Sequence, residues 1–124
     1  MATVELTRDN FSETLADNEL ILVDFWASWC GPCRTFGPIY ETVSDRHPDV
    51  VFGKVDTEAQ QELAGSFNIM SIPTLMVVRD GVVLFSQPGV LPEDALDDLI
   101  SQAQDLDMDD VKAQVAEQES QPAG

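Results

Sequence analysis

Cys30 and Cys33 are the only cysteines of this chain, and Gly-Pro separates them in the stretch WASWCGPCR at positions 26–34. Side chains three positions apart on a helix are neighbours, so the two sulfur atoms can form a disulfide if a helix starts between them. Pro32 favours such a start, because its fixed φ angle and missing N–H suit a first helical turn. The apolar segment LILVDFW at 20–26 is typical of a buried strand that would carry Cys30 to the edge of a sheet.

The chemistry that this spacing favours is thiol–disulfide exchange. Free N–H groups at a helix start stabilise an anion, so we expect the pKa of the Cys30 thiol to lie below its ordinary value. Cys33 lies one turn further into the helix, and we expect it to be less exposed than Cys30. Cys30 is therefore predicted to attack a disulfide, and Cys33 to resolve the mixed disulfide by attacking Cys30.

Two other uses of the cysteine pair are less favoured. A closed zinc site needs four ligands, and the one histidine, His47, is separated from Cys33 by the expected helix, so a zinc site would need two chains. A permanent structural disulfide across so short a loop would restrain the unfolded chain very little. We therefore expect a redox function and no bound metal.

Asp24 is unusual because it interrupts the apolar strand. Burial favours the protonated form of a carboxyl group and raises its pKa. Alternation along the strand places Asp24 on the face opposite its two neighbours, beneath the helix that carries Cys33. A carboxyl group with a raised pKa is suited to exchanging the Cys33 proton as a general base, through a water molecule. The alternative is a purely structural acid paired with Lys54, the only lysine among residues 1–92.

Hydrophobic periodicity predicts the other elements. Residues Phe36, Ile39, Tyr40 and Val43 recur at helical spacing after the cysteines. The sequence 79–81, Arg-Asp-Gly between two apolar runs, predicts a hairpin. Strands are expected at 4–6, 20–26, 50–56, 74–78 and 82–86, and helices from Thr7, from the cysteines to near His47, at 61–67 and around 96–103. This alternation predicts an α/β fold in which helices flank a central mixed sheet, parallel with an antiparallel hairpin.

The chain is strongly acidic, with 23 Asp and Glu against 6 Lys and Arg, a net charge of −17. Such a surface repels phosphate backbones and anionic lipids, so neither nucleic acid nor a membrane is expected as a partner. The N-terminal sequence MATVELTRDNF lacks the basic and apolar regions of a secretory signal, and a cytoplasmic location is the expectation.

Acidic residues are dense after position 92, with ten acids and one base in residues 93–124. We expect one domain over residues 1–104 and an acidic C-terminal extension over 105–124 that is partly helical or disordered. Asp107 would cap a helix in MDDVKAQVAEQE, and the ending SQPAG would be disordered. The extension either aids solubility as a solvated surface or binds a partner.

Taken together, these residues resemble the thioredoxin family. The similarity rests on DFWASWCGPC, on SIPT at 71–74 and on Gly89 after the hairpin, and it extends over about residues 3–104. WCGPC after an apolar strand is highly specific, and a Cys-x-x-Cys motif near a βαβ pattern is the signature that general sequence rules assign to this fold.

The resemblance implies a role for each matching residue. Cys30 matches the nucleophile of the family and Cys33 its resolving cysteine, while Asp24 matches the buried acid and Lys54 its neighbour. Pro73 matches a cis-proline that faces the pair, and the backbone before it binds an extended substrate segment. The apolar surface that receives the substrate is matched by Trp29, Gly31, Pro32, Ile72 and Gly89.

The resemblance also implies partners. Such a protein reduces disulfides in target proteins such as reductases and peroxidases, and it receives electrons from NADPH through a flavin-dependent thioredoxin reductase. It holds no bound cofactor besides its redox-active disulfide, and a monomer is expected. Gly-Pro between the cysteines favours a reductant over an oxidase or isomerase, which usually carries a histidine there. A binding module or holdase that uses the acidic extension to recruit clients is a further alternative.

Overall fold

The computed structural model describes residues 2–120. Of the ending SQPAG, which was expected to be disordered, Ser120 ends the last helix and the other four residues lie outside the described part. The helices and strands follow the predicted order β-α-β-α-β-α-β-β-α, with one more helix at the end. They are β1 (Thr3–Glu5), α1 (Phe11–Asp17), β2 (Leu20–Trp26), α2 (Gly31–Ser44), β3 (Val51–Asp56), α3 (Gln61–Ser66), β4 (Thr74–Arg79), β5 (Val82–Pro88), α4 (Glu93–Asp105) and α5 (Met108–Ser120).

The five strands form one mixed sheet in the order β1-β3-β2-β4-β5. β1, β3 and β2 are parallel, whereas β4 is antiparallel to β2 and β5 is antiparallel to β4. β2 lies in the middle of the sheet, and six of its seven residues are buried. This confirms the prediction that its apolar run is covered on both faces.

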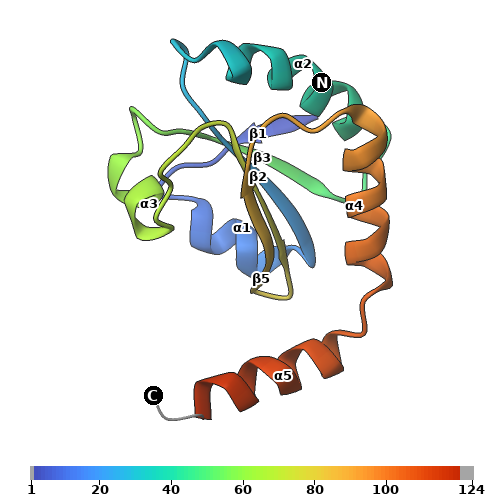
Figure 1. The fold of residues 1–124 in the computed structure, drawn as a ribbon. Helices are drawn as coiled ribbons and strands as arrows, with labels where there is room; N and C mark the ends of the chain where they lie inside the picture. The colour runs from blue at the N-terminus through green and yellow to red at the C-terminus, as the bar shows by residue number, and fades with distance from the viewer. Residues whose placement is uncertain (1, 121–124) are drawn as a thin grey trace.

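Alternate residues of β2 face two separate cores, so the molecule has three layers (Figure 1). Leu20 and Leu22 pack against α2 and α4, whereas Ile21 and Val23 pack with α1 and α3 on the other face. The predicted fold class, a mixed sheet flanked by helices, is confirmed. The layer with α2 and α4 covers the side of β2 to which Asp24 points.

The hairpin between β4 and β5 has the turn that its sequence predicts. Asp80 and Gly81 have φ angles of 52° and 78°. Both angles lie in the left-handed region that a type I′ turn requires, and Asp-Gly is a preferred sequence for this turn. The antiparallel edge of the sheet therefore follows from two residues.

The start of α1 differs from the prediction. Thr7 does not open the helix, which begins at Phe11. The side-chain Oδ1 of Asn10 accepts a hydrogen bond of 2.8 Å from the backbone N–H of Thr7, so the four residues before the helix form a closed turn. This local bond holds Thr7 outside the helix.

Arg79 connects the end of β4 to the end of α4. Its Nη1 donates to the carbonyl oxygens of Ala103, Gln104 and Leu106 at 2.7, 2.9 and 2.9 Å. These carbonyls have no helical partner, and a guanidinium group satisfies them in hydrogen bonding and in charge. Arg79 therefore fixes the end of α4 against the sheet.

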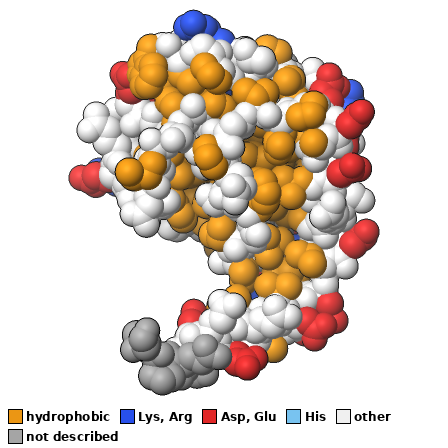
Figure 2. Space-filling view, in the orientation of Figure 1, with side chains coloured by type: hydrophobic (Ala, Val, Ile, Leu, Met, Phe, Trp, Pro, Cys, Tyr) orange, Lys and Arg blue, Asp and Glu red, His pale blue; other side chains and the backbone are white. Residues whose placement is uncertain are grey.

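α5 follows α4 after a short break and projects away from the sheet at the bottom of Figure 1. The expected helix after Asp107 is present, and Asp107 Oδ1 accepts from the backbone N–H of Asp109 and Asp110 at 3.0 and 3.3 Å. Figure 2 shows acidic side chains along the α4 side and near α5. The division into a domain and an extension at residue 104 stays a prediction. No helix within residues 2–120 is long and apolar enough to cross a membrane.

Candidate functional site

The cysteine pair lies at the N-terminus of α2, where β2 delivers the chain to the edge of the sheet. Cys30 is the N-cap residue, and its Sγ accepts a hydrogen bond of 3.2 Å from the backbone N–H of Cys33. Pro32 occupies the first turn, as predicted. The two cysteines form a disulfide, with Cα atoms 5.2 Å apart. One N–H of the first turn of α2, that of Cys33, is therefore directed at the sulfur of Cys30.

The predicted difference in exposure between the two cysteines is wrong. Cys30 is 4% exposed and Cys33 is 5% exposed. Cys30 is covered because Ile72 packs against the pair, and the Ile72 carbonyl oxygen lies 3.7 Å from Cys30 Sγ. The exposed fraction of the residue therefore does not explain a difference in reactivity between the two thiols. Such a difference would come from the electrostatic surroundings of each sulfur and from the direction in which a target can approach it.

Ile72 belongs to the segment that faces the pair, and the peptide bond between Ile72 and Pro73 is cis. The Gly89 N–H donates to the Pro73 carbonyl oxygen at 2.8 Å, which connects this segment to the end of β5. Gly89 has a φ angle of 114°, a backbone conformation that residues other than glycine rarely adopt. Ile72 thus lies beside Cys30, and Gly89 is hydrogen-bonded to the residue that follows Ile72.

The remaining predicted residues of the apolar surface lie next to Cys30 in the chain. Trp29 is 64% exposed, and Gly31 and Pro32 are exposed as well. Gly89 is exposed, whereas Ile72 is half-buried and Pro73 is buried. Five of the six predicted residues thus present accessible surface around the disulfide, and Pro73 supports the segment from below.

Asp24 is 1% exposed, and its Oδ1 has no hydrogen-bond partner. Burial raises the pKa of this carboxyl group to about 7, against a lowering by the positive charge of Lys54 and a further raising by the negative charge of Glu41. The predicted direction of the shift is confirmed, and its main cause is desolvation. A pKa near neutrality allows Asp24 both to accept and to donate a proton near pH 7.

Lys54 lies opposite Asp24 in the register of β2 and β3. Its Nζ lies 5.1 Å from the ring centroid of Trp26, in a cation–π contact. No salt bridge joins Lys54 to a carboxylate among residues 2–120. The structure therefore does not contain the alternative, a structural ion pair between Asp24 and Lys54. The positive charge of Lys54 still lowers the pKa of Asp24 from a distance.

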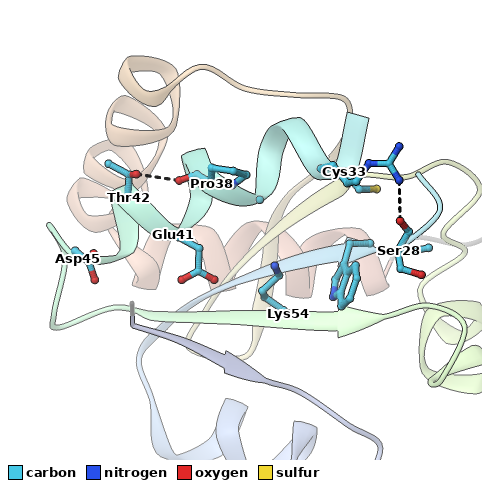
Figure 3. Close-up of a pocket in the computed structure, with 11 residues that line it drawn as sticks. Ser28, Cys33, Pro38, Glu41, Thr42, Asp45 and Lys54 are labelled. Atoms are coloured by element: carbon cyan, nitrogen blue, oxygen red, sulfur yellow. Dashed lines mark hydrogen bonds between the residues drawn. The ribbon is translucent and has the colours of Figure 1, made fainter. Parts of the chain in front are cut away.

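A cavity of about 570 Å³ opens between α2 and β3 beside Cys33 (Figure 3). It is lined by Trp26, Ala27, Ser28, Cys33, Arg34, Gly37, Pro38, Glu41, Thr42, Asp45 and Lys54. Glu41 from α2 and Lys54 from β3 both point into this space. The cavity gives Cys33 a route to solvent on the side of α2 that faces the sheet.

His47 lies away from the cysteines, and its Nε2 lies 2.9 Å from Asp97 Oδ1. Within residues 2–120, no three His, Cys, Asp or Glu side chains gather in a way that could hold a metal ion.

Comparison with known proteins decides the family. The family model described as Thioredoxin matches residues 2–102. The chain belongs to the thioredoxin family. A Streptomyces coelicolor protein, provisionally named thioredoxin 2, is 62% identical over 97% of this chain and 90% of its own length. Thioredoxin from Bacillus subtilis is 39% identical over 82% of this chain and 97% of its own length.

Solved structures of thioredoxins agree with this family assignment. A mutant thioredoxin from Halobacterium salinarum superposes with a TM-score of 0.78 at 32% identity, covering 85% of this chain and 93% of its own. Oxidised thioredoxin from Plasmodium falciparum superposes with a TM-score of 0.72 at 34% identity, covering 82% of this chain and 97% of its own. With its Cys30–Cys33 pair, this thioredoxin-family protein is a thiol–disulfide oxidoreductase.

Sequence reasoning missed Glu41. Its Oε2 is buried without a hydrogen-bond partner, and its Oε1 accepts a bond of 2.6 Å from Thr3 Oγ1. The sequence did contain a signal for Glu41. The residues of α2 that line the cavity recur at spacings of three and four from Cys33 onward, as one face of a helix does. That stripe includes one acid two turns after Cys33, on the side that faces Lys54.

Proposed function

We propose that this protein reduces disulfides in other proteins, with Cys30 as the nucleophile and Cys33 as the resolving cysteine. The observation that carries this proposal is the position of Cys30 at the N-cap of α2, where its sulfur accepts the N–H of Cys33. After reduction, this N–H and the helix start of α2 would favour the thiolate of Cys30 over its thiol. Cys33, which lies within the first turn, lacks this position.

The proposed reaction has two exchange steps. The Cys30 thiolate attacks one sulfur of the target disulfide, forms a mixed disulfide and releases the other target sulfur as a thiolate. The Cys33 thiolate then attacks the Cys30 sulfur, forms the Cys30–Cys33 disulfide and releases the second target sulfur. Two electrons pass to the target in total, and the target thiolates take up two protons.

Asp24 would serve the second step as the general base. Cys33 must lose its proton before it attacks, and a carboxyl group with a pKa of about 7 is half ionised near neutral pH. Proton transfer would run through solvent in the cavity that Cys33 lines. Lys54 would keep the ionised form of Asp24 accessible, because its positive charge lowers the carboxyl pKa against the effect of burial.

The target would bind over the exposed surface around Trp29, Gly31 and Pro32 and along the segment from Ile72 to Gly89. Exposed apolar side chains next to a disulfide mark a surface that a partner covers. An extended target segment could pair with the backbone at Ile72 by strand addition, which fixes its disulfide in line with Cys30 Sγ. The short distance between Ile72 O and Cys30 Sγ, 3.7 Å, supports this arrangement.

We further propose that electrons come from NADPH through a flavin-dependent thioredoxin reductase, that targets include reductases and peroxidases, and that the protein acts as a monomer in the cytoplasm. The cysteine pair needs an external reductant after each cycle, since it holds only two electrons. The family match over residues 2–102 supports this route.

A turnover assay tests the proposal. The protein is mixed with NADPH, a bacterial thioredoxin reductase and insulin, and NADPH oxidation is followed. Wild type should consume NADPH, Cys30→Ser should not, and Cys33→Ser should accumulate a mixed disulfide that a non-reducing gel detects. A chain that ends at Gln104 should retain activity if the acidic extension is no part of the reaction. NADPH oxidation by Cys30→Ser at the wild-type rate would refute the proposal.

A further inference from the structure

Three charged residues that line the cavity, Arg34, Asp45 and Glu41, have no part in the proposed mechanism, and the one whose charge acts on Asp24 is Glu41. It lies on the face of α2 that covers the sheet, two turns after Cys33, and points toward β3 (Figure 3). Thr3 Oγ1 of β1 donates to its Oε1 at 2.6 Å and so fixes the carboxylate. The other oxygen, Oε2, is buried and has no hydrogen-bond partner. Burying a carboxylate oxygen without a hydrogen-bond partner lowers the free energy of unfolding. A native group of this kind therefore requires an explanation, such as a function.

The groups that face Asp24 come from three elements. β3 contributes Lys54, and α2 contributes Tyr40 and Glu41, whereas β4 places the apolar Leu75 opposite Asp24. Tyr40 Oη donates to the Gly53 carbonyl oxygen at 2.8 Å. Burial, followed by the charges of Asp24 and Glu41, raises the pKa of Tyr40 well above its ordinary value, so Tyr40 stays neutral. The charges that act on Asp24 are therefore one cation and one anion.

We propose that Glu41 is a positioning residue for the exchange reaction: its carboxylate, fixed by Thr3 in the cavity that Lys54 also lines, offsets the positive charge that Lys54 places opposite Asp24. This inference rests on the proposed role of Asp24 as the base. Without Glu41, the field of Lys54 would act on Asp24 unopposed, and the carboxyl group would ionise at lower pH. Asp24 would then be a weaker base toward Cys33, because basicity follows the pKa.

The burial of Asp24 and of the Glu41 Oε2 atom supplies low-dielectric surroundings, in which such a charge acts over a distance. Two charges interact several times more strongly at a partly buried position than in bulk water. Glu41 is half-buried and its Oε2 is fully covered, so solvent screens it less than it screens the acids on the outer surface. The direction of its effect on Asp24, a raised pKa, agrees with this geometry.

The test is Glu41→Gln, which removes the charge but keeps an oxygen that can accept the Thr3 hydrogen bond. The ionisation of Asp24 is followed by ¹³C NMR of its carboxyl carbon in reduced protein. We expect its midpoint to move to lower pH by about half a unit, a roughly threefold change in the equilibrium. The low-pH limb of the pH–rate profile for resolution of the mixed disulfide should move in the same direction.

Two control variants separate the charge from other effects. Glu13→Gln removes one negative charge from an exposed position on α1 and should leave the midpoint unchanged. Thr3→Val removes the hydrogen bond but keeps the charge, and it should move the midpoint less than Glu41→Gln does. An unchanged midpoint in Glu41→Gln, a shift to higher pH, or an equal shift in either control would overturn the inference.

Asp24→Asn distinguishes this inference from the proposed function. If Asp24→Asn resolves the mixed disulfide with the wild-type pH profile, Asp24 is not the base and the proposed mechanism fails. If Asp24→Asn loses the limb near pH 7 while Glu41→Gln leaves the Asp24 midpoint in place, the mechanism stands and only the role of Glu41 is refuted.

Discussion

Asp24 and Lys54 lie opposite each other on β2 and β3, yet their side chains form no salt bridge within residues 2–120. The Lys54 ammonium lies over the Trp26 ring, 5.1 Å from its centroid, and the Asp24 Oδ1 has no hydrogen-bond partner. Burial without a direct partner disfavours the ionised form of a carboxyl group and so raises its pKa. The separation of these two groups therefore leaves Asp24 free to gain and lose a proton near neutral pH.

Replacing Asp24 by Asn should stabilise the protein at high pH. The folded-state pKa of about 7 lies above the ordinary value of 3.8, so the native state binds a proton that the unfolded chain has lost between these values. Wild-type stability should thus fall as pH rises from about 4 to 7, by up to about 4 kcal/mol. Urea unfolding of both proteins at pH 4, 6 and 8 measures this. A difference between them that does not change with pH would contradict it.

Replacing Arg79 by Lys should destabilise the fold although the charge is kept. A single ammonium nitrogen cannot replace both guanidinium nitrogens, of which Nη1 serves three carbonyls at the end of α4 and Nη2 donates to Glu19. The side chain is only 15% exposed, and we expect a loss of about 1–3 kcal/mol in urea unfolding. The control is Arg8→Lys, whose surface pair with Glu62 is largely exposed and should be worth less than about 1 kcal/mol. Equal losses in the two variants would refute the role of Arg79.

Replacing Asp97 by Asn should destabilise the protein only above acidic pH. The hydrogen bond to His47, followed by the charge and hydrogen bond of Arg46, lowers the pKa of Asp97. Its contribution should be fully present above the ordinary aspartate pKa of about 3.9 and disappear as pH falls through the lowered pKa. We expect a cost of about 0.5–1 kcal/mol at pH 7, because the group is partly exposed. Denaturant unfolding at pH 7 and pH 3 measures it, and an equal cost at both would contradict this account.

Local sequence signals were sufficient for much of the fold. The alternation of apolar strands and amphipathic helices predicts the order of the elements. Asp80-Gly81 alone predicts the hairpin, because few pairs of consecutive residues both adopt a positive φ angle. The Cys30–Cys33 spacing, with Pro32 between them, predicts a disulfide at a helix start for the same local reason. Where local signals competed, prediction failed: the side chain of Asn10 keeps Thr7 out of α1.

The parts that the sequence did not reveal depend on contacts between distant segments. Cys30 is as buried as Cys33 because Ile72, 42 positions later, packs on it, and no spacing rule near the cysteines contains that information. Glu41 acquires its position through Thr3 of β1, 38 positions earlier. Such long-range contacts follow only once the sheet order and the placement of α2 are known.

The most direct test of the account is the identity of the cysteine that reacts first. Cys30 and Cys33 are almost equally exposed, so accessibility of the residue does not favour either one, whereas Cys30 Sγ is the sulfur that accepts the backbone N–H of Cys33 at the start of α2. Reduced protein is treated with less than one equivalent of iodoacetamide at pH 6, and the labelled cysteine is located by mass spectrometry. At this pH an ordinary thiol, with a pKa of about 8.5, is less than about 1% thiolate. The account predicts rapid labelling at Cys30 and almost none at Cys33; equal labelling, or labelling at Cys33, would contradict it.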